Sequence, residues 1–65
     1  MKEENRIQLK VRLEMLGITN KKLAVILGIS EQSVHDKMVG RKPFKLKEAK
    51  TICDTFKIEP SIFLG

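Results

Sequence analysis

Basic side chains are concentrated in the middle of this 65-residue chain. Residues 20–50 hold eight Lys or Arg residues against three acidic ones, whereas the rest of the chain holds five of each sign. The whole formal net charge of +5 therefore belongs to the central stretch. Such a positive face is the usual electrostatic footprint for a phosphate backbone, although a solvated lysine face that only aids solubility explains the charge equally well. The eight basic residues are Lys21, Lys22, Lys37, Arg41, Lys42, Lys45, Lys47 and Lys50.

Side chains for catalysis or metal binding do not form a recognisable pattern in this sequence. The single histidine, His35, has no Cys, Asp or Glu at metal-ligand spacing and is better explained as an exposed helix residue. The single cysteine, Cys53, excludes an internal disulfide and is typical of a small core residue. We therefore expect a protein that is not an enzyme and takes no metal, cofactor or small-molecule ligand.

The length and composition predict one globular domain over residues 1–65, with 42% hydrophobic and 32% charged residues. No apolar run approaches the ~20 residues of a membrane span. The first residues, Met-Lys-Glu-Glu-Asn, lead into no apolar segment of a signal peptide. We expect a cytoplasmic protein without membrane contact.

Apolar residues recur at helical spacing and predict an all-α fold of five short helices. Leu9, Leu13 and Leu16 form a stripe at i, i+4 and i+7, while Thr19 and Ser30 are typical N-caps of the next two helices. Alternation typical of a strand is missing. The helices are predicted at about 3–16, 20–27, 31–39 and 46–56, with a final short helix that has Pro60 in its first turn.

The predicted core combines the apolar faces of these helices. The three phenylalanines are expected in the core rather than stacked on bases, because no aromatic residue lies among the basic ones. The expected core residues of the last two segments and the preceding turn are Phe44, Leu46, Ala49, Ile52, Cys53, Phe56, Ile62, Phe63 and Leu64.

The segment 20–39 has the spacing of a helix-turn-helix. Its two predicted helices are linked only by residues 28–30, too short a link for a parallel pair, so the second helix leaves at a steep angle. Ala24 is small where the helices would approach, and Gly28 can adopt a positive φ in the turn. The four- and six-residue spacing from Ala24 through Gly28 to Val34 is typical of this motif.

Across nearly its whole length the chain resembles the Xre/Cro-type helix-turn-helix proteins, which have the lambda-repressor-like fold. Its last two helical segments also resemble that family, and the run after residue 39 resembles small prophage regulators. The matching stretches are Gly17-Ile-Thr-Asn-Lys-Lys-Leu-Ala24, Leu27-Gly-Ile-Ser30, Ser33-Val34, Lys37-Met-Val-Gly-Arg-Lys-Pro-Phe44, Glu48-Ala49, Ile52-Cys-Asp-Thr-Phe56 and Ile58-Glu-Pro-Ser-Ile-Phe63.

This resemblance implies that the third helix enters the major groove of double-stranded DNA. The implied base-reading residues are Glu31, Gln32, Ser33 and Asp36. Glutamine can bond bidentately to adenine N6 and N7, and a carboxylate can accept from cytosine N4. The implied phosphate-contacting residues are Asn20, Lys21, Lys22, His35, Lys37, Arg41, Lys42 and Lys45.

Three positions depart from the family pattern. Lys37 stands where an apolar residue is common, so we expect a packed stem with the ammonium directed to solvent or DNA. Lys45 replaces the usual Ser or Thr N-cap, which predicts a less well-defined start of the fourth helix. Glu31 and Asp36 bring negative charge near DNA, which should weaken non-specific binding.

The resemblance implies a transcriptional repressor or switch protein of a prophage or mobile element, binding near-palindromic DNA as a homodimer. The exposed parts of Ile7, Val11, Met15, Ile62 and Leu64 are the candidates for a dimer contact. The alternative is a protein-interaction module of antitoxin or anti-repressor type on the same fold, which Glu31 and Asp36 would favour.

Overall fold

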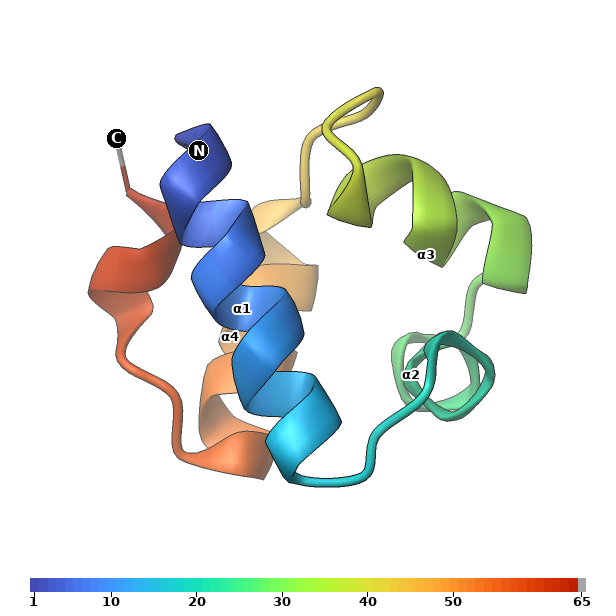
Figure 1. Ribbon diagram of the computed structural model, residues 1–65. Helices are drawn as coiled ribbons and strands as arrows, with labels where there is room; N and C mark the ends of the chain where they lie inside the picture. Colours follow the sequence, from blue (N-terminus) through green and yellow to red (C-terminus); the bar gives the residue numbers. More distant parts are fainter. Residues whose placement is uncertain (65) are drawn as a thin grey trace.

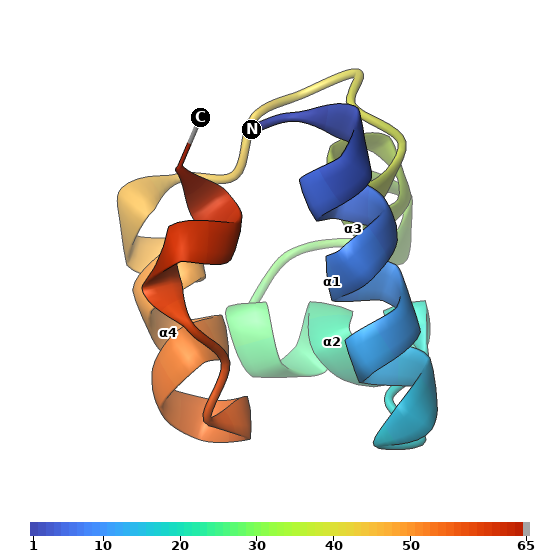
Figure 2. The same ribbon diagram turned by 60° about the vertical axis from the view of Figure 1, so that its left-hand side comes forward.

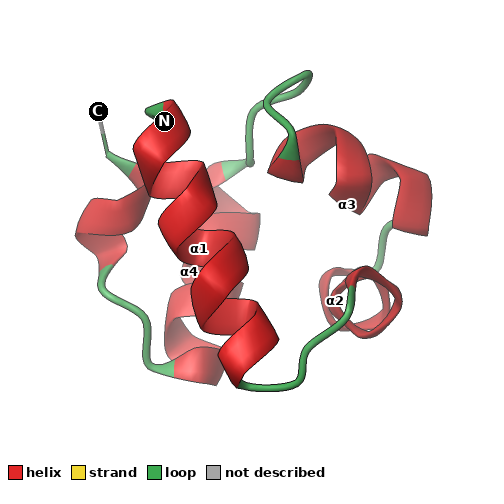
Figure 3. Cartoon of the chain, in the orientation of Figure 1, coloured by secondary structure: helices red, strands yellow, loops and turns green. Residues whose placement is uncertain are grey.

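The computed structural model describes residues 1–64 and contains four α-helices followed by a short 3-10 helix (Figure 1). Helix and connecting turns account for all of the described residues, none of which forms a strand (Figure 3). The all-α prediction is therefore confirmed for that part of the chain. The elements are α1 (Glu3–Met15), α2 (Asn20–Leu27), α3 (Glu31–Met38), α4 (Leu46–Phe56) and the 3-10 helix η1 (Pro60–Phe63).

The prediction of five α-helices is wrong, because the last segment is a 3-10 helix of four residues. The Ile62 N–H donates to the Glu59 carbonyl and the Leu64 N–H to the Ser61 carbonyl, each at 3.1 Å, which is the i to i+3 pattern of a 3-10 turn. Pro60 lies in the first turn as predicted. So short a segment does not reach the length at which α-helical bonds become favourable.

Capping residues define the ends of α2 and α3 where the sequence predicted them. The Thr19 hydroxyl accepts from the Lys22 N–H at 3.2 Å, and the Ser30 hydroxyl accepts from the Ser33 N–H at 3.0 Å. Gly28 ends α2 with φ of 69°, a left-handed conformation that favours glycine. Figure 1 views α2 nearly along its axis while α3 runs across the page, so the two helices cross steeply.

The core lies between α1, α2, α3 and α4. Seven hydrophobic residues are buried: Leu9, Leu13, Leu23, Ala24, Val34, Ile52 and Ile58. Phe44, Phe56 and Phe63 pack against them, as expected, and the Phe44 and Phe63 rings meet edge to face with centroids 5.5 Å apart. Three expected core residues are exposed instead, namely Leu16, Leu46 and Leu64, of which Leu46 is 87% and Leu64 69% exposed.

The exposure of Leu16 and Leu46 follows from where the helices end. Leu16 is the C-cap of α1, and Ile18 packs against the core in its place while its N–H bonds to the Leu13 carbonyl. Leu46 is the first residue of α4, at the edge of a face centred on Ile52.

The two ends of the described chain lie close together (Figure 1), and η1 lies against both α1 and α4 (Figure 2). The Asn5 side-chain amide donates to the Leu64 carbonyl at 3.0 Å and ties α1 to the residue that follows η1. None of the helices in residues 1–64 is long and apolar enough to cross a membrane.

Candidate nucleic-acid interface

α2 and α3 lie on the side of the molecule away from η1 (Figure 1). The exposed residues of α3 and of the first turn of α2 are polar and form the surface described here. A depression in this surface is lined by six residues, five of which the sequence analysis assigned to DNA contact. The exposed residues of α3 in this surface include Glu31, Gln32 and His35. The structure therefore brings together, from two helices, residues that the sequence placed up to fifteen positions apart. The lining residues are Thr19, Asn20, Lys21, Glu31, Gln32 and His35.

Exposed basic residues lie in the first turn of α2 and in the stretch between α3 and α4. Lys21 and Lys22 are exposed in the first turn of α2, and Lys45 is exposed just before α4. Arg41 and Lys42, in the loop that follows α3, have side chains 68% and 59% exposed. These ammonium and guanidinium groups can reach anionic groups in solvent, as phosphate contact requires.

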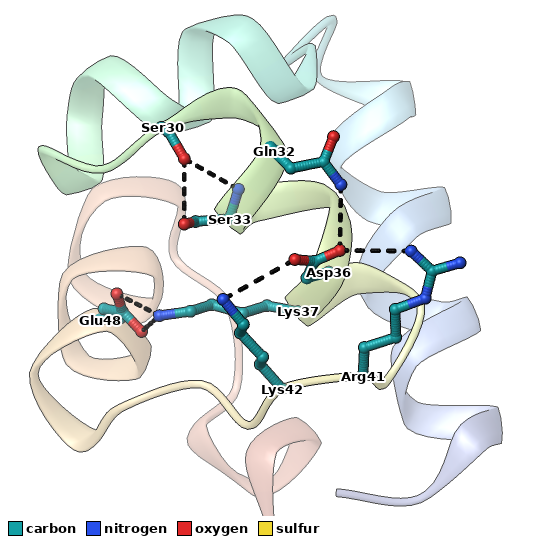
Figure 4. A network of polar contacts seen from close by, with 8 residues as sticks. All are labelled: Ser30, Gln32, Ser33, Asp36, Lys37, Arg41, Lys42 and Glu48. Carbon is teal, nitrogen blue, oxygen red and sulfur yellow. Dashed lines mark hydrogen bonds and ion pairs between the residues drawn. The ribbon is translucent and has the colours of Figure 1, made fainter.

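Asp36 is the centre of a polar network at the end of α3 (Figure 4). Its Oδ1 accepts from Gln32 Nε2 at 3.1 Å and from Arg41 Nη1 at 3.4 Å, and its Oδ2 lies 3.8 Å from Lys42 Nζ. The Gln32 bond, aided by the charges of Lys42 and Arg41, holds the pKa of Asp36 below its usual value despite partial desolvation. Two cations thus offset the negative charge that was expected to oppose DNA, which leaves Glu31 as the uncompensated carboxylate on this surface.

Ser33 is half-buried and takes part in the cap of α3 (Figure 4). Besides its N–H bond to Ser30, its hydroxyl oxygen accepts from the Ser30 hydroxyl at 3.0 Å. Its own hydroxyl proton remains to donate to another group. Ser33 therefore helps to fix the start of α3 and keeps the donor expected of it.

Lys37 does not direct its ammonium to solvent or DNA, so that prediction is wrong. The residue is 6% exposed, and its ammonium donates to both carboxylate oxygens of Glu48 on α4, with Nζ to Oε2 at 2.6 Å. A lysine buried on the inner side of a helix needs such a partner, because an unpaired buried charge is strongly unfavourable. Lys37 is thus an internal structural residue and is removed from the set of phosphate-contacting candidates.

The expectation of a less well-defined start of α4 is also wrong. The helix begins at Leu46 as predicted, and the Lys45 N–H donates to Glu48 Oε1 at 2.8 Å. Glu48 at the third helical position thus supplies a cap from inside the helix, which is half of a capping box. The Lys45 ammonium has no acceptor and cannot supply the other half.

Glu48 is the residue that sequence reasoning missed. Burial raises its pKa most strongly, but the bonds from Lys37 and from the Lys45 N–H together outweigh this and hold the pKa below its usual value. Two signals could have identified it: an acidic residue three positions after a helix N-cap, and an unexplained lysine at an apolar position.

Residues 1–64 contain no cluster of three His, Cys, Asp or Glu side chains placed to hold a metal ion.

No curated protein and no solved structure matches the chain. The family model of the BetR domain matches residues 8–65, which is most of the sequence and includes all of α2, α3 and α4. The chain therefore belongs to the BetR domain family and is a small all-helical member of it.

Proposed function

We propose that this protein is a regulator that binds double-stranded DNA sequence-specifically, with α2 and α3 acting as a helix-turn-helix and α3 in the major groove. The observation that carries the proposal is the shared surface of α2 and α3, where five candidate contact residues line one depression and exposed cations lie in the first turn of α2 and between α3 and α4. Membership of the BetR domain family and the resemblance to Xre/Cro-type proteins support the same assignment.

Contacts divide by chemistry into those that position the protein and those that read the bases. Asn20, Lys21 and Lys22 hold phosphates beside α2, and Arg41, Lys42 and Lys45 hold them beyond the end of α3. His35 lies between these groups on the exposed face. Gln32, Glu31 and Ser33 are placed toward the N-terminal half of α3 and supply the acceptors and donors for base edges.

The regulatory mechanism proposed is occupancy. The protein covers a promoter of a prophage or mobile element and excludes polymerase, acting as a repressor or switch. A short α3 of eight residues supplies few base contacts, so binding as a homodimer to a near-palindromic site increases affinity and specificity.

The alternative function is a protein-interaction module of antitoxin or anti-repressor type. The specific observation in its favour is Glu31, an exposed carboxylate that lines the depression without a counter-ion among the described side chains. Asp36 gives this alternative less support than the sequence analysis suggested, because Arg41 and Lys42 offset the charge of its carboxylate.

The test is fluorescence-anisotropy binding to random duplex DNA over a salt series. We expect log K to fall linearly with log salt, and each phosphate contacted should contribute about −0.9 to the slope. The measured slope should correspond to a total of roughly four or more phosphate contacts. The double variant Lys21→Gln/Lys22→Gln should reduce that total by about two contacts.

The matched control is Lys50→Gln/Lys57→Gln, which removes the same charge from exposed positions in α4 and directly after it. An unchanged slope in this control locates the DNA on the α2–α3 surface. A folded chain that does not bind duplex DNA at low salt would overturn the proposal and favour the protein-interaction alternative, and an equal effect of both double variants would overturn the assigned surface.

A further inference from the structure

Asp36 and Gln32 lie one helical turn apart on the exposed side of α3, and their side chains meet at 3.1 Å. A carboxylate only accepts hydrogen bonds, so the Nε2 end of the amide must face Asp36 and the Oε1 end must face away. The opposite orientation would place two acceptor oxygens together. The amide of Gln32 is therefore held in one of its two orientations.

The held orientation leaves Gln32 able to read a base. One Nε2 proton bonds to Asp36, while the second proton and Oε1 remain. These are the donor and the acceptor that adenine N7 and N6 require for a bidentate pair. Fixing the amide before DNA arrives also lowers the entropy lost on binding.

The same carboxylate holds the loop that follows α3. The Arg41 and Lys42 side chains both approach its oxygens (Figure 4). The backbone N–H groups of these two residues also donate to the Asp36 carbonyl, at 2.8 and 3.3 Å. The Asp36 side chain is only 15% exposed although both cations are mostly exposed. These contacts occupy the carboxylate on several sides and oppose its use as an acceptor for cytosine N4.

Resting on the proposed function above, we propose that Asp36 is a positioning residue rather than a base-reading residue. It orients the Gln32 amide for adenine and fixes the Arg41–Lys42 loop against α3. Base recognition by Gln32 and phosphate contact by the loop are thereby coupled through one side chain.

The test begins with a duplex selected by the wild-type protein from a random library, followed by binding to all four base pairs at each position. Gln32→Ala should remove the preference for adenine at one position. Asp36→Asn should weaken the preference at that same position by about 5-fold or more, because asparagine accommodates both orientations of the amide. The affinity of Asp36→Asn for random duplex DNA should be equal to or higher than that of the wild-type protein, because the variant has lost a negative charge.

A double-mutant cycle separates positioning from direct reading. If Asp36 acts through Gln32, Asp36→Asn should cause no further loss of discrimination in the Gln32→Ala background. The control Asp54→Asn removes the same charge from an exposed position on α4 and should leave all preferences unchanged. A loss of preference at a different, cytosine-containing position, additive with Gln32→Ala, would overturn the proposal.

A second measurement needs no DNA and is independent of the proposed function. In the NMR spectrum of the free protein, the Nε2 proton of Gln32 that bonds to Asp36 should be shifted downfield from the value of a free glutamine side chain, and this displacement should decrease in Asp36→Asn but not in Asp54→Asn. Unchanged Gln32 amide shifts in Asp36→Asn would overturn the positioning role even if the wild-type protein binds DNA. Wild-type protein that shows this downfield shift but does not bind duplex DNA would instead overturn the proposed function, and with it the base-reading part of this inference.

Discussion

Lys37 on α3 and Glu48 on α4 form a buried ion pair, with side chains 7% and 8% exposed. The ammonium donates to both carboxylate oxygens, and one of these oxygens also accepts from the Lys45 N–H. A single carboxylate thus fixes the end of α3, the residue before α4 and the first turn of α4. The loop between these helices contains Arg41 and Lys42, so the pair sets the frame that holds two proposed phosphate contacts.

Breaking this pair on one side should destabilise the protein strongly. Lys37→Met leaves Glu48 buried without its counter-ion, and the expected loss in the free energy of unfolding is about 3–5 kcal/mol. The double variant Lys37→Met/Glu48→Leu removes both charges and should recover most of that loss, although it also gives up the bond from the Lys45 N–H. Urea denaturation measures the three free energies.

The matched control is Lys42→Met, which breaks the exposed contact with Asp36 and should cost less than about 1 kcal/mol. A Lys37→Met variant no less stable than Lys42→Met would show that the buried pair does not hold α3 and α4 together. A double variant as unstable as the single one would show that packing, rather than the unpaired charge, causes the loss.

The protein should become less stable in acid, because the pKa values of two carboxylates are lower in the folded state than in the unfolded state. The pKa of Glu48 is lowered in the folded state, because bonds from Lys37 and Lys45 outweigh its burial, and the pKa of Asp36 is lowered mainly by the bond from Gln32. The folded state therefore binds protons less readily than the unfolded state, and the stabilisation is complete above the unfolded-state carboxyl pKa of about 4. It is lost as the pH falls through the lowered pKa values.

Urea midpoints measured from about pH 7 to about pH 2 should be nearly constant above about pH 5 and decrease below about pH 4. The variant Lys37→Met/Glu48→Leu should show a shallower decrease, since one of the two groups is absent. Midpoints that increase on acidification would contradict the assigned directions.

Cys53 should react slowly with thiol reagents. It lies in the wall of an apolar groove beside Phe44 and Phe63, and burial, followed by the negative charges of Asp54 and Glu59, raises the pKa of its thiol. Alkylation by iodoacetamide near pH 7 should be slower than that of a free cysteine peptide and should accelerate only as the pH rises through the raised pKa.

The matched variant is Asp54→Asn, which removes one of the two negative charges and should increase the alkylation rate of the folded protein near neutral pH. A folded-state rate equal to that of the urea-unfolded chain would show that the thiol is not protected.

Signals within a few residues of each other determined most of the secondary structure from the sequence alone. Thr19 and Ser30 capped the helices that they were predicted to cap, and Gly28 adopted the left-handed conformation of the turn, because a cap or a turn depends on neighbours within one helical turn. The contact between Gln32 and Asp36 is of the same local kind and was deducible from their i, i+4 spacing.

The tertiary structure decided which of these side chains remain free to act. Whether the Lys37 ammonium reaches solvent depends on where α4 places Glu48, eleven residues further along the chain. The exposure of Leu46 depends likewise on the position of α4 relative to the core, and the charge of Asp36 depends on the path of the loop that returns Arg41 and Lys42 to it. Local patterns specify which face of a helix is apolar, but the partner of a buried charge is set by how the helices pack, since burial and ion pairing are properties of the assembled fold.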